Sequence, residues 1–288
     1  MHRILPTILF CLIWAAAGAA QIPPSGPKNN PAYAEQIRRD YNEVTIGSHS
    51  VANSGGALPS DYRNYRSRSV RAIRVSKDTQ NRLKVNEADL GAYRAILKTI
   101  GTRVVKLLPM VECAPTPLAD NECARKQTEI TNNANSYSFQ YGLHVPPAFG
   151  DLRLFEGNLD AWDNQMQTIL TNLGDVPLEN VTLDTEGVKY LSDFVPHPQL
   201  DEAVKQALQF AAGVKDGKFA YSKIVTPAMG DTIAMRSIGY SADEGRRSIS
   251  SDIIIVMKVV KKDTDGSLTI LWKELDRRSP PMVFYKAS

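Results

Sequence analysis

The stretch IIIVMKVVKKDTDGSLTILWKEL, residues 253–275, decides the fold. Its first residues, 253–256, are continuously apolar, which is typical of a central strand that is buried on both faces. The sequence DTDG at residues 263–266 predicts a tight turn. Residues 268–275 then return as a second strand. Because the turn is short, the two strands are expected to pair antiparallel.

Further elements are expected on either side of this hairpin. Strands are predicted at residues 136–141, 151–155, 219–225, 232–240, 253–260, 268–275 and 282–285. Helices are predicted from apolar residues at helical spacing over 184–194 and 199–212, and over a longer stretch from the N-cap residue Asn86 to Pro109. The fold class is therefore α+β, with helices followed by a C-terminal antiparallel meander. The main domain is expected over 61–288, and a subdivision near 135–150 is left open.

The first 20 residues have the pattern of a secretory signal peptide. A basic start at Met1-His2-Arg3 precedes an apolar run over 4–14 and small residues over 15–20. The apolar run is shorter than the roughly 20 residues of a membrane-spanning helix. We expect cleavage after Ala20, and the alternative is an uncleaved anchor. The sequence thus predicts export to the periplasm or the extracellular space, with no transmembrane segment after cleavage.

The beginning of the mature chain predicts an arm and a disulfide. Residues 21–60 are rich in Pro, Asn, Ser and Gly, which favours a loosely ordered arm or linker. After cleavage only Cys113 and Cys123 remain, and a pair of cysteines in an exported chain indicates a disulfide. Closing a loop of this length would stabilise the fold by about 3 kcal/mol. The alternative is two free thiols or half of a metal site.

Residues 63–84 are the most strongly charged part of the chain. They hold eight Lys or Arg residues and one Asp, which suits phosphates, anionic lipid headgroups or acidic glycans. The candidate polyanion-binding residues are Arg63, Arg66, Arg68, Arg71 and Arg74. The alternative is a solvated face balanced elsewhere in the fold, since the rest of the chain after cleavage has a net negative charge.

Several sequence pieces resemble a group of uncharacterised exported bacterial proteins. The pieces are NSYSF at 135–139, LGDVPL at 173–178, TIAMRSIGY at 232–240 and GSLTILWKEL at 266–275. The resemblance covers residues 135–280, and it implies a bacterial source. The group has no assigned activity, so the resemblance carries no functional residue to this chain.

Motifs for catalysis and cofactor binding are missing from the sequence. It has no G-x-S-x-G motif, no P-loop and no dinucleotide-binding glycine motif. His49, His144 and His197 are too far apart for a zinc-protease motif, so we expect no metal and no cofactor. Carboxylates are frequent between residues 156 and 186, but the sequence does not select a catalytic pair among Glu156, Asp160, Asp163, Asp175, Glu179, Asp184 and Glu186.

Two functions are consistent with these observations. The first, which we favour, is a non-enzymatic binding or structural module of the cell envelope. Its partner would be an envelope protein or an acidic polymer, because export argues against genomic DNA. The second is a secreted hydrolase that uses a carboxylate pair on an unfamiliar scaffold. Whether the protein is an enzyme is left undecided, although the missing motifs favour a module without catalysis.

Overall fold

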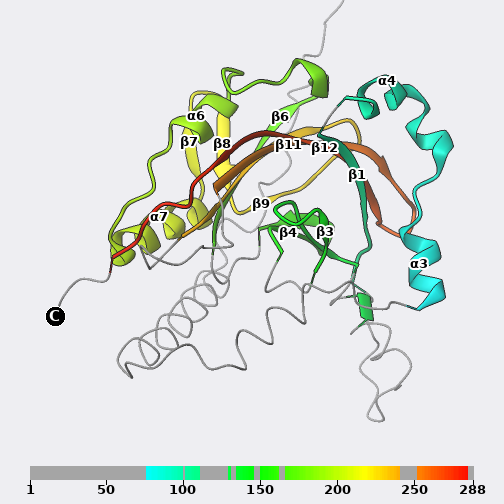
Figure 1. The fold of residues 1–288 in the computed structure, drawn as a ribbon, viewed down its shortest axis with the longest axis horizontal. Helices are drawn as coiled ribbons and strands as arrows, with labels where there is room; N and C mark the ends of the chain where they lie inside the picture. The colour runs from blue at the N-terminus through cyan, green and yellow to red at the C-terminus, as the bar shows by residue number, and fades with distance from the viewer. Residues whose placement is uncertain are drawn as a thin grey trace, which may run out of the picture.

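The computed structural model describes residues 76–99, 101–110, 129–130, 134–145, 150–161, 166–240 and 252–284. These residues form two antiparallel sheets that share one apolar core. Helices pack against the opposite face of the larger sheet. In Figure 1, α4 and α6 lie on one side of that sheet, and β3 and β4 lie on the other. The predicted signal peptide and arm, residues 1–60, lie outside the described residues.

The larger sheet has seven strands, with β10 in the middle and β11 beside it. In spatial order they are β1 (Thr102–Leu107), β12 (Leu268–Arg278), β11 (Asp252–Lys262), β10 (Thr232–Gly239), β6 (Met166–Gly174), β8 (Phe219–Ser222) and β7 (Val214–Asp216). The predicted antiparallel meander β10–β11–β12 is confirmed. The predicted turn is also confirmed, because the Gly266 N–H donates to the Asp263 carbonyl oxygen at 3.0 Å.

The apolar run at the start of β11 is buried on both faces, as predicted. Ile253 and Ile255 face the core between the sheets, whereas Ile254 and Val256 face the helices. All four side chains are at most 1% exposed. Successive strand residues point to opposite faces, so a run with no polar alternation is what a strand covered on both sides requires.

The smaller sheet has five strands and covers one face of the larger sheet. In spatial order they are β3 (Leu143–His144), β2 (Ser136–Ser138), β4 (Leu152–Phe155), β5 (Asn158–Asp160) and β9 (Ile224–Val225). The predicted return of 151–155 beside 136–141 is confirmed, although all three residues of β2 are buried rather than half-buried. Phe139, Leu154 and Leu159 pack in the same core as Met235 and Trp272.

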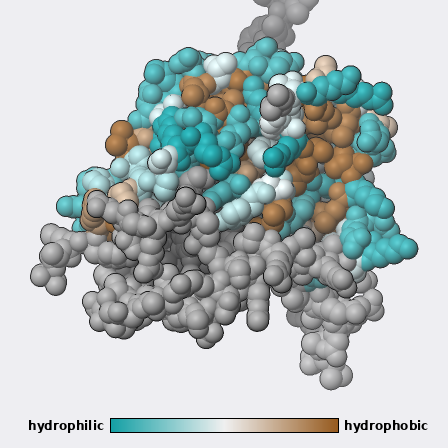
Figure 2. All heavy atoms as spheres, viewed as in Figure 1, coloured by the Kyte–Doolittle hydropathy of each residue, from teal (hydrophilic) through white to brown (hydrophobic). Residues whose placement is uncertain are grey.

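Helices cover the other face of the larger sheet. They are η1 (Glu87–Tyr93), α4 (Arg94–Leu97), η3 (Leu178–Asn180), α6 (Val188–Asp193) and α7 (Leu200–Ala212), while α3 (Lys77–Leu83) packs beside Leu108. The two helices predicted at 184–194 and 199–212 are thus confirmed within a few residues. Among the described residues, no helix has the length and apolar character needed to cross a bilayer. Figure 2 shows apolar patches among hydrophilic residues on the side where α4 and β1 lie.

The long helix predicted from Asn86 to Pro109 is wrong in its second half. Asn86 does cap η1, since its side chain accepts from the Ala88 N–H at 3.0 Å, but the helical part ends at Leu97. Gly101 has a φ of 87°, which breaks a right-handed helix, and residues 102–107 form β1 instead. Pairing with β12 overrides the helical spacing of the apolar residues in this stretch.

The expected order of helices before the sheet holds only in part. Strands β1 to β6 precede α6 and α7, and β1 and β6 join the same sheet as the C-terminal meander. Strand β6 was not predicted. Residues 282–285 were predicted as a strand, yet Phe284 forms only an isolated bridge with Gln199.

Candidate functional site

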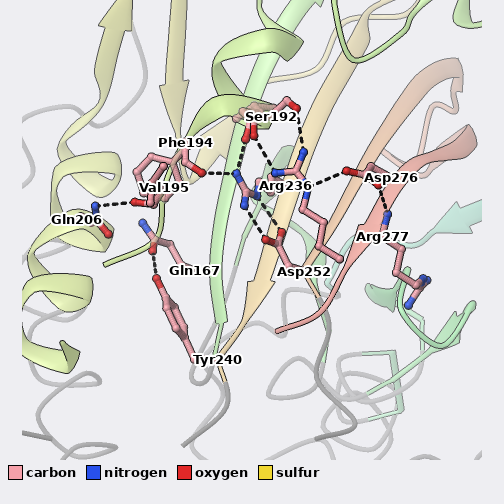
Figure 3. A network of polar contacts seen from close by, with 12 residues as sticks. Gln167, Ser192, Phe194, Val195, Gln206, Arg236, Tyr240, Asp252, Asp276 and Arg277 are labelled. Carbon is pink, nitrogen blue, oxygen red and sulfur yellow. Dashed lines mark hydrogen bonds and ion pairs between the residues drawn. The ribbon is translucent and has the colours of Figure 1, made fainter. Parts of the chain in front are cut away.

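The most deeply buried cation among the described residues lies on β10, beside the end of α6. Arg236 is only 2% exposed, and its Nε and Nη2 donate to the two carboxylate oxygens of Asp252 at 2.8 and 2.6 Å. Its Nη1 donates to the carbonyl oxygens of Leu191 and Phe194, both at 2.6 Å (Figure 3). Since a buried charge is stable only when it is paired and hydrogen-bonded, this arrangement ties two strands to the helix end.

A second buried cation lies at the other end of the same strand pair. Lys258 on β11 stands opposite Thr232 on β10, on the face that the helices cover. Its Nζ donates to Asp175 Oδ1 at 2.7 Å, to the Gly230 carbonyl at 2.8 Å and to the Val176 carbonyl at 3.2 Å. The Lys258 side chain is 9% exposed, whereas that of Asp175 is 84% exposed. Solvent therefore contacts this ion pair mainly at the Asp175 carboxylate.

Cations on β12 make the same kind of contact. Lys273 Nζ donates to the Val181 carbonyl at 3.0 Å, and Arg278 Nη1 donates to the Ser192 carbonyl at 2.8 Å. Residues 175–194, which we call the covering segment, hold only short helices, so many of their carbonyls lack a partner within a helix. Four cations of the larger sheet therefore satisfy carbonyls of the covering segment.

A buried carboxylate joins the two sheets. Asp151 is 0% exposed, and its Oδ1 accepts from Ser237 Oγ on β10 at 2.7 Å. Its Oδ2 accepts from Ser138 Oγ at 3.0 Å and from the N–H groups of Phe139 and Gln140 at 2.6 and 3.2 Å. Burial raises the pKa of Asp151, and these hydrogen bonds oppose the rise. A carboxylate with a raised pKa is a candidate acid or base, but this one is enclosed between the sheets.

The structure separates the candidate carboxylates into different contacts. Asp160 on β5 pairs with Arg153 at 2.7 Å, and Asp175 pairs with Lys258. Glu186 pairs with Lys218 at 2.7 Å on the surface. Glu156 lies in the turn between β4 and β5, Glu179 lies in η3, Asp184 lies in the covering segment, and Asp163 is outside the described residues. No group of three His, Cys, Asp or Glu side chains with the arrangement of a metal site is found in the described ranges.

The two described histidines make local hydrogen bonds. His144 Nδ1 lies 3.0 Å from the Ser136 carbonyl oxygen, to which it donates, and burial lowers the pKa of His144. His197 Nδ1 accepts from the Gln199 N–H at 3.1 Å just before α7. His49 lies outside the described residues.

Two predicted sites lie outside the described residues. These are the cysteines Cys113 and Cys123 and the arginines Arg63, Arg66, Arg68, Arg71 and Arg74. The C-terminal end of the basic stretch is described, and there Arg82 pairs with Asp265 at 3.0 Å while Lys84 donates to Asn81. At this end, part of the positive charge is therefore balanced within the fold.

Sequence reasoning missed the buried polar contacts of Arg236 and Asp151. For Arg236 the available signal was a lone arginine inside the apolar strand TIAMRSIGY, because a buried strand tolerates such a charge only beside a buried partner. The chain matches no protein-family model, no curated protein and no solved structure. The resemblance to exported bacterial proteins therefore stays a prediction.

Proposed function

We propose that the protein is a non-enzymatic binding or structural module of a bacterial cell envelope, exported to the periplasm or beyond. The observation that carries this proposal is how the interior charges are used. Arg236 is 2% exposed, and its N–H groups donate to Asp252 and to two main-chain carbonyl oxygens. Such a group holds elements together and has no donor directed at a ligand.

The other buried charged groups support the same interpretation. A general acid or base must come within hydrogen-bond reach of its substrate. Asp151 is fully buried and holds four hydrogen-bond donors, so a substrate would reach it only if the two sheets separated. Lys258 is bonded to Asp175 and to main-chain carbonyls. These groups stabilise a β-rich scaffold on which a binding surface can be displayed.

The proposed binding surface is the basic stretch, residues 63–84, and its partner is an acidic polymer of the envelope. The described end of this stretch comprises α3 and its C-cap residue Lys84, and Lys77 and Lys84 are both exposed. The ion pair of Arg82 with Asp265 neutralises one charge there. The arginines upstream are the residues that we propose for polyanion contact, since guanidinium groups bind carboxylate, sulfate and phosphate oxygens in pairs.

Retention of the full chain on heparin and on lipopolysaccharide beads tests this proposal. The wild-type protein is expected to be retained at low salt and to elute as salt screens its charges. The triple variant R66E/R68E/R71E is expected to lose most of this retention. The matched control K189E/K205E/K218E makes the same change in net charge, at lysines whose side chains are 63%, 63% and 69% exposed, and it is expected to be retained far better.

Two outcomes would count against the polyanion partner. One is a retention that does not depend on salt. The other is equal loss of retention in the two triple variants, since that would assign the effect to net charge and not to the basic stretch.

A further inference from the structure

Strand β1 is an edge strand with one open side. It pairs with β12, and among the described residues no strand lies on its other side. The N–H of Leu108, just past the end of β1, donates to the Ala134 carbonyl at 3.0 Å, and the N–H of Thr102 bonds to the turn before it. Since N–H groups alternate in direction along an antiparallel strand, those of Val104 and Lys106 also point away from β12.

The outward main-chain groups of β1 are a template for another strand. The N–H and carbonyl groups of Val104 and Lys106 have no main-chain partner on the open side in the described part of the chain. Such a row of unpaired groups accepts an extended peptide as an additional strand. The opposite edge of the sheet is less suited, because β7 has only three residues and its exposed Lys215 and Asp216 carry opposite charges.

Apolar side chains lie beside β1. Ile96 and Leu97 on α4 and Val104 on β1 pack against the cluster under the helices, yet they remain partly exposed. Figure 2 shows apolar patches on this side of the molecule. An added strand would therefore cover apolar surface as well as pair with the main chain, and both contribute to the stability of a complex.

Three cations without a carboxylate partner lie near the start of β1. Arg94 on α4, Lys98 at the end of α4 and Arg103 on β1 are exposed, and they form no ion pair within the described ranges. Arg103 lies on the face of β1 toward the core between the sheets, whereas α4 lies on the opposite face. At the far end of β1, Lys106 pairs with Asp263 at 2.7 Å, so the unbalanced charge is confined to the start.

We propose that the open edge of β1 binds an extended peptide segment of a partner protein, antiparallel to β1 and with carboxylates near its C-terminal end. Antiparallel pairing places that end beside the start of β1, where the cations lie. Neighbouring strand residues point to opposite faces, so two adjacent carboxylates would meet Arg103 on one face and the cations of α4 on the other.

The charges argue against a second copy of this chain as the occupant. An antiparallel second β1 would bring its own Arg103 and Lys106 toward the same cations, and like charges across an interface repel. The proposed peptide site is separate from the basic stretch, residues 63–84, and does not rest on its role.

Three synthetic peptides test the site by fluorescence polarisation. Each has six residues, the length of β1, with Thr and Val alternating before a final pair of Glu, Ser or Lys residues and a C-terminal amide. The complete protein is expected to bind the Glu peptide saturably, and at least about tenfold more tightly than the Lys peptide at low salt. No saturable binding of the Glu peptide, or equal affinity for all three peptides, would overturn the proposal.

Amide hydrogen exchange shows whether the bound peptide pairs with the main chain. The amides of Val104 and Lys106 are expected to exchange at least about tenfold more slowly at saturating Glu peptide, whereas that of Val105, which faces β12, should change little. If the peptide binds and the Val104 and Lys106 amides stay unprotected, the cations form a general polyanion site and strand addition is wrong.

Charge reversal separates the cations of α4 from net charge. R94E/K98E is expected to weaken the binding of the Glu peptide by at least about tenfold. The matched control K189E/K205E makes the same change in net charge at two lysines whose side chains are each 63% exposed, and it should bind like the wild-type protein. Equal affinities of the two variants for the Glu peptide would contradict the proposal.

Discussion

Replacing Arg236 with methionine tests whether the buried charges hold the layers together. The change removes the bidentate contact with Asp252, whose side chain is 4% exposed, and leaves that carboxylate buried without a cation. It also removes the donor to the carbonyls of Leu191 and Phe194. Removing one partner of a buried ion pair costs about 3–5 kcal/mol, and unsatisfied carbonyls add to this. We expect R236M to lower the free energy of unfolding by about 4–6 kcal/mol, against the ~5–15 kcal/mol of a typical domain.

Urea unfolding followed by tryptophan fluorescence measures this loss. Asp252→Asn keeps an oxygen acceptor beside Arg236, so it is expected to cost less than R236M and to report on the same contact if R236M does not fold. Arg82→Met is the control, because the Arg82 and Asp265 side chains are 32% and 48% exposed, and such surface pairs contribute about 0–1 kcal/mol. If the free energy of unfolding of R236M lies within about 1 kcal/mol of the wild-type value, the ion pair does not hold α6 to the sheet.

Three further predictions follow from particular residues. Gly187→Ala is expected to lower the free energy of unfolding by about 2–4 kcal/mol, because its Cβ would lie 2.7 Å from a leucine methyl and its φ is 89°. Gly213 has a φ of 90° but nothing within 4 Å, so Gly213→Ala should cost clearly less and isolates the effect of the close contact. Burial raises the pKa of Asp151 above 3.8, so the folded chain binds more protons than the unfolded chain just above that pH and its stability falls as pH rises there. Asp151→Asn should flatten this dependence in urea titrations, and an unchanged slope would contradict the assignment. Mass spectrometry of exported protein digested without reductant should show a peptide that links Cys113 to Cys123, and free thiols would refute the disulfide.

The C-terminal meander and the two helices before it were accessible from the sequence because their signals are local. The turn at residues 263–266 has the composition that a tight turn needs, and the run at 253–256 has no polar residue. Helix α7 has its acidic residues in the first turn and its apolar residues on one face. In each case, neighbouring residues are enough to select the structure.

Strand β1 and the buried polar contacts depend on distant partners, which local patterns do not record. The apolar residues of 102–107 fit a helix by spacing, and only pairing with β12, more than 160 residues later, makes them a strand. Asp151 and Ser237 are 86 residues apart in the chain, and Arg236 and Asp252 are separated by 16. A sequence pattern shows that a buried charge needs a partner but does not say which residue provides it.

Export is the central claim of the proposed function, since an envelope module must cross the membrane to work. The most direct test expresses the complete chain in a bacterium, separates the cell fractions and measures the intact mass of the purified protein. We predict a product that begins at Gln21 and is recovered outside the cytoplasm. A full-length product that retains Met1 and remains with the cytosolic proteins would contradict the proposed function.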